Sequence, residues 1–175
     1  MKLRDRMNYD GPVMSALVFR LDPLIEGQNL ILGAALFGLL GDIAVKYSAH
    51  RVLTTGAVHG AADGVNTLIG TSDPTTLAGA ITMVNDIHAK FSAHIVRIAS
   101  ATHGIADICS TLALPKVSLN ATWVQVRDLA NHIRTQYEAH RVLTTGAVHG
   151  AADNTNTIAD AVVSTVFVPT LDTEV

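Results

Sequence analysis

The sequence predicts a mostly α fold in which three copies of one unit, each a long helix followed by an extended loop, stand between short terminal arms. Residues 49–63 and 139–153 share the sequence AHRVLTTGAVHGAAD, and residues 93–107, AHIVRIASATHGIAD, keep its frame. Before each of these segments, apolar residues recur at spacings of three and four, as on the buried face of an amphipathic helix. Identity over so long a stretch indicates internal duplication.

The repeats divide the chain into one domain and two arms. The domain covers residues 22–160, with copies at about 22–70, 72–114 and 118–160. Residues 1–21 form an irregular N-terminal arm, and residues 161–175 form a C-terminal arm that contains a short β-branched run. Such arms pack on their own core or extend over a neighbouring subunit, and the sequence leaves both arrangements open.

Each predicted helix has a start signal and a buried aromatic residue. Asp22-Pro23 and Asp73-Pro74 combine a capping side chain with a proline at the first helical position, and Ser118 or Asn120 is the candidate cap of the third helix. The expected lengths are roughly 21 to 28 residues, or about 30–40 Å. The equivalent aromatic residues, which we assign to the core, are Tyr47, Phe91 and Tyr137.

The segment after each helix changes in character. β-branched residues and glycines at 51–58 predict an extended loop, and the same holds at 95–102 and 141–148. A short capped turn is expected after Asp63 and its equivalents. These connections are longer than helical bundles usually have, so we expect the loops to cover the bundle or to pair as short strands.

Two histidines and one aspartate recur in every copy and are the candidate site residues. Imidazole and carboxylate are ligands for zinc and other transition metals. If the first histidine folds back over the turn that carries the other two residues, each copy offers a three-ligand metal site. The candidates are His50, His59 and Asp63; His94, His103 and Asp107; and His140, His149 and Asp153.

A plainer interpretation of these residues is structural, and the sequence favours it. A neutral histidine has one donor and one acceptor, so it can fasten a loop to a helix end while the aspartate fixes its tautomer. No HExxH, CxxC, phosphate-binding loop or dinucleotide-binding motif is present. We therefore assign no metal firmly and predict no catalytic residue, no cofactor and no enzymatic activity.

Four further residues receive individual predictions. His88 and His132 lie outside the repeated frame and are assigned to the surface or an interface. Cys109 is assigned to the core, and Trp123 is expected to anchor the third helix.

Composition limits the classes of partner that the chain is expected to bind. Charged residues make up only 15% of the chain, against about 25% in a typical soluble domain. This low content predicts that other subunits cover much of the surface, as in a homo-oligomer. The net charge of -3 gives no basic footprint for nucleic acid, and the apolar stretch 30–40 is too short to span a membrane.

The repeated sequence resembles segments of virion structural proteins of tailed bacteriophages. The matching segments are YSAHRVLTTGAVHGAADGVNT at 47–67 and YEAHRVLTTGAVHGAADNTNT at 137–157, and the middle copy departs from them in its loop. The resemblance implies a capsid decoration or cement protein of the virion, made in the host cytoplasm, with the major capsid protein as partner; a neck or tail role stays open. The alternatives from the residues are a metal-binding protein or metal-dependent hydrolase, and an adaptor that presents its loops to a partner.

Overall fold

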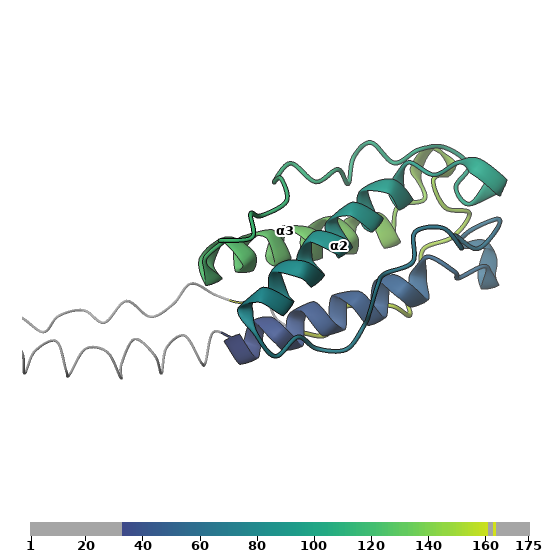
Figure 1. The fold of residues 1–175 in the computed structure, drawn as a ribbon. Helices are drawn as coiled ribbons and strands as arrows, with labels where there is room; N and C mark the ends of the chain where they lie inside the picture. The colour runs from purple at the N-terminus through teal and green to yellow at the C-terminus, as the bar shows by residue number, and fades with distance from the viewer. Residues whose placement is uncertain (1–32, 161–162, 164–175) are drawn as a thin grey trace, which may run out of the picture.

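The computed structural model describes residues 33–160 and 163, and these form the mostly α fold that the repeats predict. Three helices lie side by side, and the loops that follow them gather at one end of the bundle (Figure 1). The described residues contain no strand, so the expectation that the loops pair as strands is wrong for this part of the chain. The two arms fall outside the described residues, except for Val163.

Two of the three helices are shorter than the sequence predicts. The first helix runs over residues 33–50 of the described chain, α2 spans Leu77–Ile95 and α3 spans Trp123–Arg141. At 1.5 Å per residue, the 19 residues of α2 or α3 extend about 28 Å. They begin later than expected because threonines just before the apolar stripe act as caps.

Those threonine caps replace the predicted ones. The side chain of Thr76 accepts a hydrogen bond from the backbone N–H of Gly79, and Thr122 forms a capping box with Gln125. The predictions that Asp73, Ser118 or Asn120 caps a helix are therefore wrong. Asp73 instead packs against Gly41, where any Cβ would overlap its carboxylate. The predicted cap at Asp22 lies outside the described residues.

The predicted apolar stripes form the core. Tyr47, Phe91 and Tyr137 have no exposed surface, as their assignment to the core requires. Their rings contact edge to face, with centroids 6.2 Å apart for Tyr47 and Phe91 and 6.3 Å apart for Phe91 and Tyr137. The hydroxyls of the tyrosines donate to the backbone carbonyls of Asn66 and Asn156, at 2.9 and 2.8 Å. Each buried aromatic ring contributes on the order of 1.5–3 kcal/mol through burial.

A tight turn replaces part of each predicted extended loop. The 3-10 turns are Thr55–Ala57, Ala99–Ala101 and Thr145–Ala147. The second and third residues of each turn have positive φ, and the third is always alanine, at 62°, 60° and 64°. Alanine at positive φ is strained, so something outside the turn must hold it.

The neighbouring copy provides that restraint. The carbonyl oxygen of Ala101 approaches Gly60 so closely that a Cβ there would lie 2.5 Å away, and Ala57 makes the same approach to Gly150. Gly104 meets Ala147 in the same way. Each copy thus contacts the next, and the third contacts the first, so the three copies form a closed ring with an approximate three-fold axis.

Hydrogen bonds at the middle of the helices follow the same cyclic order. One residue on each helix accepts a hydrogen bond from a backbone N–H in the loop of the preceding copy. The pairs are Asp42 with Ala159 at 2.7 Å, Asp86 with Ile69 at 2.8 Å, and His132 with Ala113 at 3.0 Å.

The structure also places Cys109, His88 and Trp123, and the first of these does not lie where the sequence predicts. Cys109 is exposed, so its assignment to the core is wrong; it follows Asp107 in a turn, where its backbone N–H donates to that carboxylate at 2.7 Å. His88 is half-buried and bonds through Nε2 to the Leu114 carbonyl at 2.9 Å. Trp123 packs at the start of α3 with its ring centroid 5.6 Å from that of Phe37.

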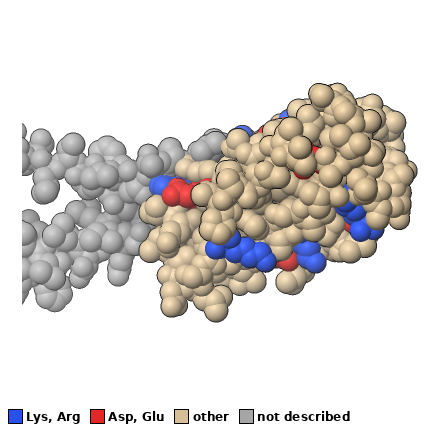
Figure 2. Space-filling model, turned by 90° about the horizontal axis from the view of Figure 1, so that it is seen from above, with Lys and Arg blue, Asp and Glu red and all other residues tan. Residues whose placement is uncertain are grey.

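The surface carries few charges. Figure 2 shows one face of the molecule, on which charged side chains form small groups among uncharged ones. Among the described residues, no helix is long and apolar enough to cross a membrane.

Candidate metal centre

Three of the candidate histidines stand at the ends of the helices nearest the loops. His50 is the last residue of the first helix, and His94 and His140 lie in the last turns of α2 and α3. All three have no exposed surface. We call these three residues the helix histidines. They continue the buried stripe one turn beyond Tyr47, Phe91 and Tyr137, which places their rings on the axis of the bundle.

Each helix histidine is held by an aspartate from the preceding copy. The distance from Nδ1 to Oδ2 is 2.9 Å for His94 and Asp63, 2.8 Å for His140 and Asp107, and 2.8 Å for His50 and Asp153. A carboxylate can only accept, so Nδ1 carries the proton and Nε2 presents a lone pair. This is the fastening that the sequence favoured, but it runs between copies rather than within one.

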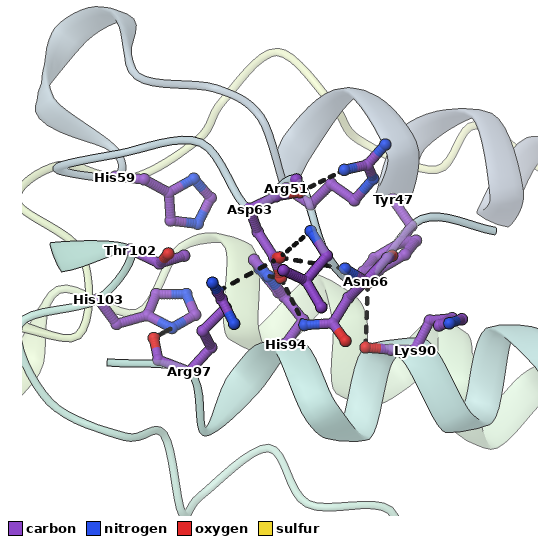
Figure 3. A network of polar contacts seen from close by, with 12 residues as sticks. Tyr47, Arg51, His59, Asp63, Asn66, Lys90, His94, Arg97, Thr102 and His103 are labelled. Atoms are coloured by element: carbon purple, nitrogen blue, oxygen red, sulfur yellow. Dashed lines mark hydrogen bonds and ion pairs between the residues drawn. The ribbon is translucent and has the colours of Figure 1, made fainter. Parts of the chain in front are cut away.

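The aspartates are themselves fixed by the turns that follow them. In the first copy, Oδ1 of Asp63 accepts from the backbone N–H groups of Val65 and Asn66 at 3.0 and 3.1 Å, and the Asn66 side chain donates to Oδ2 at 2.6 Å (Figure 3). Asp153 has the same partners in Thr155 and Asn156. The capped turn expected after Asp63 is therefore present, and it aims the carboxylate at the neighbouring helix.

The second histidine of each copy comes from the loop, just after the 3-10 turn. His59, His103 and His149, which we call the loop histidines, are 1–2% exposed. Nδ1 of His59 and of His103 lies 3.0 Å from the carbonyl oxygen of Leu53 and Arg97, respectively. A carbonyl also only accepts, so these rings have the same tautomer. In the third copy, the backbone N–H of His149 donates to the equivalent carbonyl of Leu143 at 3.3 Å.

All six Nε2 atoms are buried without a hydrogen-bond partner. A buried acceptor left unsatisfied costs about 1–3 kcal/mol, so six in one place is a large penalty unless another species binds them. The Nδ1 contacts account for how five of the rings are oriented, whereas Nδ1 of His149 is also buried without a partner. They do not account for why six lone pairs meet in the interior.

The six rings have the arrangement of an octahedron. Each ring lies edge-on to four of the others, with centroids 4.6–5.6 Å apart. The fifth ring then lies across the centre, which gives three opposite pairs. These are His50 with His103, His59 with His140, and His94 with His149. The helix histidines form one triangle and the loop histidines the other.

The ligand atoms are close enough to share one ion. His50, His59, His140 and His149 each offer a ring nitrogen within 4.8 Å of the others, and so do His59, His94, His103 and His140. Opposite nitrogens around an ion with bonds of about 2.1 Å would lie about 4.2 Å apart. The two sets share His59 and His140 and together include all six histidines.

Burial keeps the imidazoles neutral, which is the form that binds metal. Loss of solvation lowers the pKa of His59 to about 2, of His149 to about 3, and of His94 and His103 to about 4. It also lowers the pKa of His50 and His140, although their aspartate partners oppose this shift. Neighbouring imidazoles add to the effect because a second positive charge in the cluster is unfavourable.

The aspartates are kept ionised. Burial alone raises the pKa of Asp63, but hydrogen bonds from His94, Asn66 and the backbone outweigh it, so the pKa lies below its ordinary value. Asp107 and Asp153 show the same balance. Arginines lie beside two of them: Arg97 Nε is 3.4 Å from Asp63 Oδ1, and Arg141 donates to the Asp153 carbonyl at 2.5 Å.

The structure thus brings the nine candidate residues into one centre instead of three separate sites. The histidines of all copies face the axis, and the aspartates stand behind the helix histidines on their Nδ1 side. Sequence reasoning missed the supporting residues Asn66, Ser110 and Asn156. The asparagine that recurs three residues after Asp63 and after Asp153 was the available signal for two of them.

No protein-family model matches the sequence, and neither a curated protein nor a solved structure matches the chain. The resemblance to tailed-phage virion proteins therefore stays a prediction.

Proposed function

We propose that this protein binds one divalent transition-metal ion on the approximate three-fold axis, through Nε2 of all six repeated histidines. The observation that carries the proposal is the set of six buried Nε2 lone pairs that have no partner and face one another. A metal ion would satisfy all six at once. The Nδ1 contacts of the five histidines other than His149 are those that metal-bound histidines usually make to carboxylates and backbone carbonyls.

The donor set favours particular ions. Imidazole nitrogen suits iron, nickel, copper and zinc, whereas calcium and magnesium prefer oxygen. Zinc in structural sites is almost always four-coordinate. Six nitrogens in two triangles favour ions that accept six ligands readily, so Fe²⁺, Co²⁺ and Ni²⁺ are the class we propose.

We propose that the ion is structural. Catalytic metal sites keep a position open for water or substrate, and six imidazoles leave none. The ion would instead join the three copies, because two of its ligands come from each. A structural ion agrees with the sequence expectation of a non-enzymatic protein.

Metal content of the purified chain tests the stoichiometry. Native mass spectrometry of protein loaded with Co²⁺ or Ni²⁺ should show one ion per chain. Three ions per chain would favour separate sites in each copy, and none at all would contradict the proposal. The same spectrum reports the number of subunits, which tests the predicted homo-oligomer.

Replacing the loop histidines should abolish metal binding. Changing His59, His103 and His149 together to alanine removes one triangle of ligands, and the remaining three nitrogens cannot complete the sphere. We expect no retained metal after gel filtration, measured by elemental analysis. Replacing His88 and His132 together, which lie outside the cluster, is the control and should leave one ion per chain.

An aspartate behind a ligand should tune affinity rather than abolish binding. Asp63→Asn removes the charge that orients His94, and loss of such a partner typically weakens metal affinity about 10–100-fold. Competition with a chromophoric chelator measures the change. Asp128→Asn, at an exposed position beside Arg127, is the matched control. Equal affinities for the two variants would show that the carboxylate is not part of the metal site.

The place of the protein in a phage particle is a separate proposal, and the repeats support it. Large apolar side chains stand exposed on the loops, including Ile69 and Leu119, each 85% exposed, and Ile108, 78% exposed. Together with the low charge, they suit contacts with other subunits. We propose a capsid-associated structural role, with the major capsid protein as partner. In that role the metal ion would stabilise the ring of three copies.

A further inference from the structure

The six-histidine centre is closed along its axis at both ends. On the helix side, Tyr47, Phe91 and Tyr137 fill the bundle and have no exposed surface. On the loop side, the glycine of each copy meets an alanine carbonyl of the next, leaving no room even for a Cβ. An ion therefore reaches the histidines through one of the three seams between adjacent copies.

Two of those seams are covered by side chains that only the middle copy carries. Between the first and second copies, the guanidinium of Arg97 lies over the Asp63 carboxylate (Figure 3). Between the second and third copies, Ile105 lies over the 3-10 turn, with its Cδ1 2.8 Å from where a Cβ on Gly146 would stand. Both seams thus carry a side chain across their outer face.

The seam between the third and first copies lacks both covers. Leu53 stands where the middle copy has Arg97, and Ala151 stands where it has Ile105. No atom lies within 4 Å of a Cβ placed on Gly56. A groove of about 300 Å³ opens here, lined by Leu53, Thr55, Gly56, Asp153 and Asn154 among others. Residue Asp153 is part of its wall, and the carboxylate of Asp153, which holds His50, is fully buried behind that wall.

We propose that metal ions reach the centre through this groove and pass the buried carboxylate of Asp153. The inference rests on the proposed metal-binding function. An ionised carboxylate buried just behind a groove attracts cations towards it. Rotation of the His50 ring about its contact with Asp153 would then admit the ion between the helix histidines and the loop histidines.

Uptake kinetics test this route with variants taken from the chain's own copies. Metal-free protein is mixed with Co²⁺, the reaction is stopped with excess chelator at intervals, and the loaded fraction is read by native mass spectrometry. Leu53→Arg and Ala151→Ile place the covers of the middle copy over the groove. Ala61→Ile makes the same change at the seam already covered by Arg97 and is the matched control. Ile105→Ala opens a second seam.

We expect Leu53→Arg and Ala151→Ile to load about tenfold more slowly, since binding must then wait for the cover to move. Both should still reach one ion per chain. Ala61→Ile should load at the unmodified rate, and Ile105→Ala about twice as fast because two routes are then open. Unchanged rates in all four variants, or equal slowing in Ala61→Ile, would overturn the route while leaving the metal site intact. Absence of cobalt from the unmodified chain would overturn both proposals.

Discussion

Removing the metal ion is expected to lower the free energy of unfolding by about 4 kcal/mol when the loaded protein is measured at a metal concentration about a thousandfold above the dissociation constant. The physical reason is that six Nε2 atoms lose their only partner while staying buried. For a chain of this size, the expected fall in Tm is roughly 10–15 °C. Differential scanning calorimetry of loaded and chelated protein measures it.

The matched control for that experiment is the protein in which His59, His103 and His149 are alanine. Its Tm should not respond to metal, because the site is absent. A metal-dependent shift that persists in this variant would place the stabilising ion elsewhere in the chain. Identical Tm values for loaded and chelated unmodified protein would contradict a structural metal.

Mild acid is expected to unfold the metal-free protein. The buried histidines keep a lowered pKa in the folded chain, about 4 for His94 and His103, whereas they take up protons near pH 6.5 once unfolded. Stability is therefore greatest above about pH 6.5 and falls as the pH drops towards the folded values. Each histidine contributes a slope of up to about 1.4 kcal/mol per pH unit.

The slopes of these histidines act together. For the four histidines whose pKa falls to about 4 or below, His59, His94, His103 and His149, the combined loss of stability between about pH 7 and pH 5.5 is roughly 5 kcal/mol, which matches the lower end of the whole stability of a small domain, about 5–15 kcal/mol. Far-ultraviolet circular dichroism should show a steep loss of helix in this window. His59→Gln should make the transition shallower by about one proton. A metal-free fold that stays intact well below this window would show that the imidazoles are not kept neutral by burial.

The helical units could be predicted from the sequence because each signal lies within one copy. The spacing of Leu36, Leu39, Ile43 and Tyr47 fixes one helical face, and all four residues are buried. The starts of α2 and α3 were predicted wrongly because Thr76 and Thr122 are the caps. Each lies a few residues after a stronger capping signal, the Asp73-Pro74 pair before α2 and Asn120 before α3. The turns were missed because a positive φ at Ala57 has no local cause; it follows from the approach of its carbonyl to Gly150.

The candidate residues of the site were predicted, but their arrangement was not. Periodicity shows that His50, His59 and Asp63 recur, and it places His50 on the buried stripe. It does not show that Asp63 reaches His94 of the next copy, because that contact depends on how three copies close around an axis. The repeated histidines and aspartates could have formed a separate site in each copy or one centre shared by all three copies, and the sequence does not distinguish the two arrangements.

The cyclic exchange of aspartates has a consequence for the ancestry of the chain. The aspartate of each copy bonds to the helix histidine of the next copy. A polypeptide with a single unit could therefore complete the ring only by associating with two identical chains. Such a polypeptide would be a homotrimer with one ion on a true symmetry axis. Duplication and fusion would fix the trimer's stoichiometry in one gene and free each unit to diverge. Arg97, Ile105 and Ser110, which occur only in the middle unit, are the differences that identical subunits could never have acquired.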